Sequence, residues 1–150
     1  MSKSLLVENT IEIDASPAKV WDALVNPAQT KKYMYGCEAL SDWKPGSELL
    51  WQGEYEGKPM VFVKGTIGEI LPNKFLSYTT IDPLSGIDDT SSEYLMVTYR
   101  LEVENNKVKL TVTQGDYSKV NEGQRRFDEA IAAGGWSSLL VDIKKLVEGN

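Results

Sequence analysis

Histidine is absent from all 150 residues of this sequence, and cysteine occurs once, as Cys37. Without histidine the chain has neither a Ser-His-Asp nor a Cys-His triad, and it lacks a common ligand of zinc. A single cysteine excludes an internal disulfide and suits a reducing compartment. A reactive thiol needs a neighbour that lowers its pKa, so a nucleophilic role for Cys37 is not favoured. We therefore expect no catalytic residue of these classes and no metal site.

Basic residues and long apolar runs are also scarce. Acidic residues outnumber basic ones by 22 to 16, for a net charge of −6. This argues against a nucleic-acid partner, because duplex binding needs a basic surface. No window approaches the roughly 18 apolar residues of a membrane span, and the first residues lack the apolar core of a signal peptide. The isolated glycines form no phosphate-binding motif. We expect a cytoplasmic protein with no cofactor and no membrane span.

The hydrophobic content of 41% is typical of a folded domain, and 150 residues suffice for one core, so residues 1–150 are predicted to form a single domain. Alternation of apolar and polar residues over 5–13 indicates a half-buried strand. Ser16 and Pro17 suit the N-cap and first position of a helix, which we expect to end at Val25, before Asn26-Pro27. A second short helix is expected over residues 28–33.

Further alternating segments, separated by turn residues, predict consecutive strands in the middle of the chain. They lie at residues 49–55, 60–70, 75–81, 93–103 and 107–114, with a long polar loop at 82–92. Strands joined by short turns form an antiparallel sheet. After a helical segment at 119–134, a final helix carries one apolar stripe, made of Trp136, Leu139, Leu140, Ile143, Leu146 and Val147.

This order predicts an α+β, helix-grip fold: a curved antiparallel sheet of six or seven strands wrapped around a long C-terminal helix, with short helices after the first strand. On an ideal helical wheel, Phe127 and Ile131 point away from the apolar stripe of the final helix. Either the helix bends at Gly134-Gly135, or these two side chains contact a different surface. Alternatively, the glycines simply allow a close approach to the sheet.

Several motifs resemble those of a known family. Residues 10–24 read TIEIDASPAKVWDAL and resemble the opening of START-like (SRPBCC superfamily) domains, where a strand ends in a short Ala/Ser-Pro turn before a helix with a Val-Trp pair. Residues 65–70 (GTIGEI), 74–78 (KFLSY), 97–101 (VTYRL) and the helix from Gly135-Trp136 look like the branch named after the C-terminal domain of the activator of Hsp90 ATPase. The resemblance extends over nearly the whole chain.

The resemblance implies a sheet that grips the last helix, with a cavity between them, and it links the chain to stress response. The superfamily includes lipid and hormone carriers, polyketide cyclases and aromatase-like enzymes. The eukaryotic activators bind the chaperone chiefly through a separate N-terminal domain. Because this sequence begins directly at the START-like strand, we expect that domain to be missing, and the resemblance alone does not imply chaperone activation.

Alternate residues of a strand face the same side of a sheet, and this alternation predicts which side chains could bind a ligand. If the row of Leu49, Trp51 and Tyr55 faces the last helix, so should Val61, Val63 and Ile67, and the matching rows of the later strands follow. Aromatic and amide groups among apolar walls fix the orientation of small molecules. Together with the helix stripe, parity predicts a site made of Trp51, Tyr55, Val63, Tyr78, Tyr99, Gln114, Trp136, Leu140 and Ile143. Met34, Tyr35 and Met60 are expected near its mouth.

Several functions are compatible with these patterns. The leading hypothesis is a protein that holds a small hydrophobic or amphipathic ligand between the sheet and the final helix. The second is an interaction module for a chaperone or another protein, with a solid core. The third is a cyclase- or dehydratase-like enzyme with Tyr78, Tyr99 or a buried carboxylate as proton donor. A globular domain with core aromatics and no cavity is the remaining interpretation.

Overall fold

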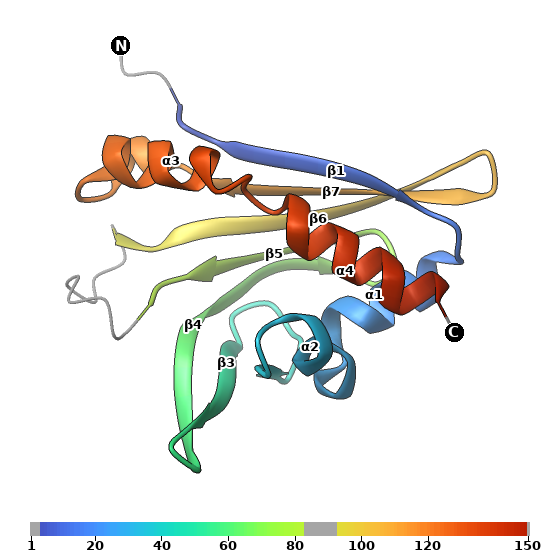
Figure 1. Cartoon of the computed structure of the whole chain (residues 1–150), viewed down its shortest axis with the longest axis horizontal. Helices are drawn as coiled ribbons and strands as arrows, with labels where there is room; N and C mark the ends of the chain where they lie inside the picture. Colours follow the sequence, from blue (N-terminus) through green and yellow to red (C-terminus); the bar gives the residue numbers. More distant parts are fainter. Residues whose placement is uncertain (1–3, 83–92, 150) are drawn as a thin grey trace.

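The computed structural model describes residues 4–82 and 93–149. It contains one seven-stranded antiparallel sheet with the strand order β1-β7-β6-β5-β4-β3-β2. The strands are β1 (Val7–Ile13), β2 (Glu38–Ser41), β3 (Glu48–Tyr55), β4 (Lys58–Leu71), β5 (Phe75–Thr80), β6 (Leu95–Glu104) and β7 (Lys107–Gly115). The helices are α1 (Pro17–Val25), α2 (Pro27–Tyr33), α3 (Gly123–Ala132) and α4 (Ser137–Glu148). Helix α4 crosses one face of the curved sheet (Figure 1), which confirms the α+β helix-grip prediction.

Local sequence accounts for both short helices after β1. The Ser16 hydroxyl accepts a hydrogen bond from the Lys19 backbone N–H, and Pro17 occupies the first turn of α1, as a missing N–H allows. The Asn26 side chain accepts from the Ala28 backbone N–H and caps α2. Strand β2 was not predicted, because its four residues at the sheet edge are too few to show alternation.

The inward rows of the later strands agree with the predicted parity. Tyr78 lies opposite Val97, and Val97 lies opposite Gln114. Leu76 lies opposite Tyr99, and Tyr99 opposite Val112. Since directly paired residues point to the same face, these side chains form one inner layer. All of them except Gln114, which is half-buried, are buried.

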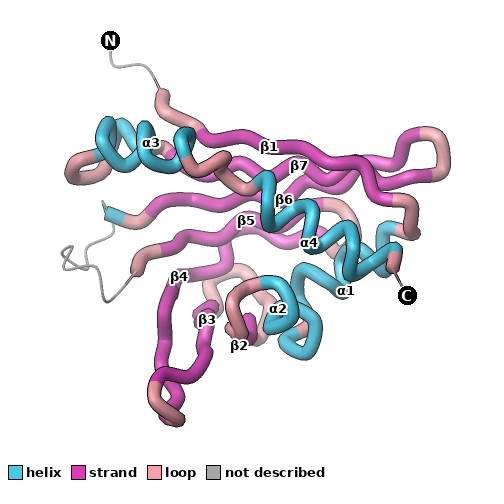
Figure 2. The backbone as a smooth tube through the Cα atoms, viewed as in Figure 1, coloured by secondary structure: helices cyan, strands magenta, loops and turns pink. Residues whose placement is uncertain are grey.

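The hairpin of β3 and β4 departs from simple alternation. The register shifts between Trp51 and Gln52: Trp51 pairs with Val63, but Gln52 pairs with Val61. Phe62 is the extra residue of this β-bulge, so Val61 shares the face of Gln52 and not that of Trp51. The expectation that Val61 faces the last helix is therefore wrong. The far end of the hairpin extends beyond the rest of the sheet (Figure 2).

The C-terminal helical region is divided at Gly134 and Gly135, which have φ of +90° and +58°. Phe127 of α3 packs in a second, smaller core with Val7, Leu95, Tyr117 and Val120, and Ile131 is exposed. The helix is thus interrupted and Phe127 contacts a different surface. The glycine also allows close approach, because a Cβ on Gly135 would lie 2.5 Å from Asn9 Oδ1.

Helix α4 buries Leu140, Ile143 and Val147 in the main core. That core lies between α4, α1 and the inner face of the sheet. The predicted loop at 82–92 lies, after Asp82, outside the described residues. Within the described ranges, no helix is both long enough and apolar enough to cross a membrane.

Candidate functional site

A pocket of about 470 Å³ opens between the sheet, the connection from α2 to β2, and the N-terminal end of α4. Strands β3 to β7 supply its floor, and Trp136, the N-cap residue of α4, supplies one wall. The connection after α2 supplies the opposite side. The lining residues are Met34, Tyr35, Cys37, Trp51, Glu54, Phe62, Val63, Tyr78, Thr80, Val97, Gln114 and Trp136. Most of this wall is apolar, and its volume is within the range of small-molecule sites.

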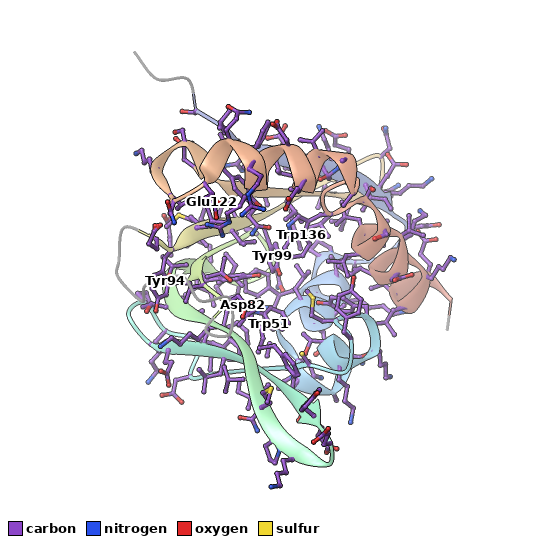
Figure 3. The ribbon with its side chains drawn as sticks, turned by 60° about the vertical axis from the view of Figure 1, so that its left-hand side comes forward. Trp51, Asp82, Tyr94, Tyr99, Glu122 and Trp136 are labelled. Carbon is purple, nitrogen blue, oxygen red and sulfur yellow. The ribbon has the colours of Figure 1, made fainter. Side chains whose placement is uncertain are left out.

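An aromatic row runs from the wall of the pocket into the core. The ring centroids of Trp51 and Tyr78 are 6.3 Å apart, those of Tyr78 and Tyr99 are 5.5 Å apart, and those of Tyr99 and Trp136 are 5.9 Å apart. Trp51, Tyr99 and Trp136 follow one another in Figure 3. The two pairs that include Tyr99 meet edge to face, an arrangement that aromatic rings favour. The row gives this side of the pocket a fixed shape.

Two buried tyrosine hydroxyls satisfy each other within the row. Tyr78 Oη and Tyr99 Oη are 2.7 Å apart. Burial raises the pKa of both hydroxyls above the ordinary value, and for Tyr99 the neighbouring Tyr78 adds to the rise. Both side chains are therefore neutral at physiological pH, and this arrangement provides no tyrosinate base.

Trp136 is held in place by two polar residues of the sheet. Its indole Nε1–H donates to Gln114 Oε1 at 2.8 Å, and its backbone N–H donates to Asn9 Oδ1 at 2.9 Å. The Asn9 amide nitrogen also donates to the Gly134 carbonyl. Asn9, which interrupts the apolar row of β1, thus fixes the start of α4 to the sheet edge. The Gln114 amide nitrogen makes no hydrogen bond within the described residues.

Trp51 contributes a donor without a partner. Its side chain is 4% exposed, yet its indole N–H makes no hydrogen bond to any described residue. Every fully buried side-chain nitrogen or oxygen in the described part of the chain has a partner, so this N–H is not fully enclosed. Trp51 also lines the pocket.

The structure brings five of the nine predicted site residues to the pocket: Trp51, Val63, Tyr78, Gln114 and Trp136. Tyr99 lies behind Tyr78 in the second layer. Leu140 and Ile143 pack in the core under α4, away from the pocket. Tyr55 is 56% exposed near the tip of the β3–β4 hairpin, beyond the elements that cover the inner row. The pocket therefore lies beside the N-terminal end of α4, and the middle of that helix packs directly in the core.

Sequence reasoning did not include several lining residues. Phe62 turns inward because of the β-bulge, for which the sequence has no clear signal. Regular alternation in residues 49–55 would place Glu54 on the face opposite Trp51, yet it lines the pocket. Cys37 comes from the connection after α2, and only the tertiary fold brings it to the sheet. Met34 and Tyr35 were predicted near the mouth and line the pocket, whereas Met60 does not.

The one thiol that lines the pocket is not activated. Burial raises the pKa of the Cys37 thiol, which lowers its thiolate fraction. The described residues contain no group of three or more cysteine or acidic side chains placed to hold a metal ion. The pocket offers apolar surface, the Trp51 indole N–H, the Gln114 amide, the Thr80 hydroxyl and the Glu54 carboxylate.

The comparisons with known proteins agree with this architecture. The solution structure of ChR145 from Cytophaga hutchinsonii is 34% identical, with a TM-score of 0.75 over 99% of this chain and 97% of that one. Protein NE0264 from Nitrosomonas europaea is 18% identical, with a TM-score of 0.73 over 99% and 97%. The Aha1 dimer from Colwellia psychrerythraea is 17% identical, with a TM-score of 0.69 over 95% and 96%. The last two show similarity of fold alone.

Among curated proteins, none matches this sequence significantly. The family model described as "Activator of Hsp90 ATPase homolog 1-like protein" matches residues 14–148. That range runs from the end of β1 to the last residue of α4, so it includes nearly all of the sheet and every element of the pocket. The chain belongs to the family of proteins like the activator of Hsp90 ATPase homologue 1.

Proposed function

We propose that this protein binds a small hydrophobic or amphipathic molecule in the pocket beside Trp136. The observation that carries the proposal is the Trp51 indole N–H, which is nearly buried and has no partner in the described residues. An indole N–H that is accessible from the pocket can donate either to water or to a bound molecule. A ligand that presents a carbonyl, ether or hydroxyl oxygen to this N–H would accept that hydrogen bond. The pocket of about 470 Å³ has room for such a molecule.

The apolar wall would supply most of the affinity. Phe62 and Val63 of β4 and Val97 of β6 present carbon surface to the pocket, and transfer of apolar area from water contributes about 25 cal/mol per Å². Methionine adapts to ligands of different shapes, and Met34 lies on the opposite side. A cytoplasmic location is part of the same proposal, because the one cysteine is a free thiol.

A neutral fluorescent probe, N-phenyl-1-naphthylamine, tests the proposal. Its emission should rise on addition of the protein and reach saturation at one equivalent. Val63→Phe fills part of the pocket and should weaken binding at least tenfold. Val103→Phe is the matched control, because it adds the same ring at an exposed position of β6 outside the pocket. If no probe binds, or if both variants bind like the wild type, the proposal is wrong.

The alternative role as an interaction module makes the opposite prediction. A chaperone or other protein that docks on the outer surface should bind Val63→Phe as well as it binds the wild type. A small molecule that occupies the pocket should bind that variant at least tenfold more weakly than it binds the wild type. Comparison of the wild type with Val63→Phe therefore distinguishes a ligand-binding protein from an interaction module.

A further inference from the structure

One carboxylate lies at the rim of the pocket. Among the described residues that line the pocket, Glu54 is the one with a formal charge, and it is exposed at the outer part of β3. Tyr35, on the connection after α2, is 85% exposed and lines the same pocket. Both residues also line a neighbouring hollow on the outer side of the hairpin. Glu54 and Tyr35 therefore form the boundary between the pocket and solvent.

Among the described residues, the Glu54 carboxylate has no partner. Within the described part of the chain it makes neither an ion pair nor a side-chain hydrogen bond. Of the described cationic residues, Lys31 lines the outer hollow and Lys58 lies opposite Tyr55 in the hairpin. Neither lines the pocket. A molecule in the pocket would therefore meet one unneutralised negative charge at its entrance.

Resting on the proposed function, we infer that the pocket selects amphiphiles with a positively charged head group. The apolar part would lie against Phe62 and Val63, and the charged head would remain at the rim. There the Glu54 carboxylate attracts a cation, and the face of the Tyr35 ring offers a further cation–π contact. An anionic head at the same position would be repelled. Because the rim is exposed, each effect is that of a partly solvated charge pair, a few-fold in affinity.

Three ligands with the same ten-carbon chain test this inference at pH 7. Decylamine is a cation, decanol is neutral and decanoate is an anion. Each is titrated as a competitor of N-phenyl-1-naphthylamine on the whole protein, below the concentration at which it forms micelles. We expect decylamine to bind about 3- to 10-fold more tightly than decanoate, with decanol between them. The difference should shrink as salt rises from about 0.05 to 0.5 M.

Two variants test whether Glu54 causes the preference for decylamine over decanoate. Glu54→Gln should make the affinities of decylamine and decanoate equal within about twofold, with decanol unchanged. Glu69→Gln is the control, because it removes the same charge from an exposed position of β4 outside the pocket. The control variant should keep the wild-type order. Thermal unfolding of both variants checks that each is folded.

The outcomes separate this inference from the proposed function. Equal binding of the three ligands to the wild type, or tighter binding of decanoate, would overturn the charge selectivity while the proposed function stands. A preference that persists in Glu54→Gln would also overturn it. Failure of decanol and the fluorescent probe to bind at all would overturn the proposed function and this inference together.

Discussion

The hydrogen bond between the hydroxyls of Tyr78 and Tyr99 holds two rings of the aromatic row in a fixed relative position. Each hydroxyl is the partner of the other at 2.7 Å, and each side chain is almost fully buried. Only Tyr78 lines the pocket. A change at Tyr78 therefore leaves the deeper hydroxyl of Tyr99 without a partner.

Tyr78→Phe is expected to reduce the free energy of unfolding by about 1–3 kcal/mol, because the buried Tyr99 hydroxyl then lacks a hydrogen bond. Adding Tyr99→Phe should recover part of this loss, since both polar groups are then gone. Urea denaturation of the two single variants and the double variant measures the coupling. Tyr55→Phe, at an exposed position, should change stability very little. A double variant that loses the sum of the two single effects would contradict this account.

Residue patterns predicted the inner rows well but not the limits of the pocket. Leu76, Tyr78, Val97 and Tyr99 lie on the predicted face, because strand alternation and pairing fix which side each residue faces. Tyr55 follows the same parity, yet no element covers the end of its hairpin. Parity assigns a face but carries no information on what lies above it.

At the scale of elements, the junction of α3 and α4 sets one wall of the pocket. Asn9 binds the backbone of Trp136, and Gly135 passes so close to β1 that a Cβ would lie 2.5 Å from Asn9 Oδ1 and 2.7 Å from Val7 Cγ1. The sequence alone is compatible with a bend at these glycines, with contact of Phe127 and Ile131 with a different surface, or with a close approach to the sheet. The choice among them depends on the position of β1, which residue patterns do not show.

Gly135→Ala is predicted to destabilise the protein by more than Gly46→Ala. Both glycines have positive φ, +58° and +85°, but a Cβ on Gly46 would meet nothing within 4 Å. Gly46→Ala should cost about 1–2 kcal/mol from backbone conformation alone. Gly135→Ala carries the same penalty and also forces Asn9 or Val7 to move. Chemical denaturation of the two variants tests this, and equal losses of stability would contradict the close approach.

The β-bulge between β3 and β4 is another feature that could not be predicted from the sequence. It inserts Phe62 opposite the Trp51–Gln52 step and brings its ring next to Gly53, where an added Cβ would lie 3.2 Å from Phe62 Cε2. A run of Met60, Val61, Phe62 and Val63 is apolar at every position, so alternation cannot show where one residue is added. Tertiary packing decides it.

At the scale of the whole molecule, several buried tyrosines make stability sensitive to alkaline pH. Burial raises the pKa of Tyr33, Tyr78 and Tyr99 above the ordinary value of 10.0. Above about pH 10 the unfolded chain loses these protons while the folded chain keeps them, so the folded state binds more protons. The stabilisation is complete below pH 10 and is lost as pH rises further.

The free energy of unfolding should therefore fall between about pH 10 and 11, by up to about 1.4 kcal/mol per pH unit for each such tyrosine. Urea denaturation at several pH values measures the slope. The Tyr78→Phe/Tyr99→Phe variant removes two of these groups and should show a shallower decline. A wild-type stability that stays constant up to pH 11 would show that the hydroxyls ionise normally in the folded protein.

The proposed function requires that a small molecule enters the pocket beside Trp51 and Trp136. The chain has four tryptophans, and the other two, Trp21 and Trp43, do not line the pocket. The most direct measurement is the indole N–H region of a ¹H–¹⁵N NMR spectrum during titration with decanol. We predict that the Trp51 resonance shifts most, with a smaller shift for Trp136 and none for Trp21 or Trp43. A spectrum in which Trp51 does not move at saturating decanol would contradict the account.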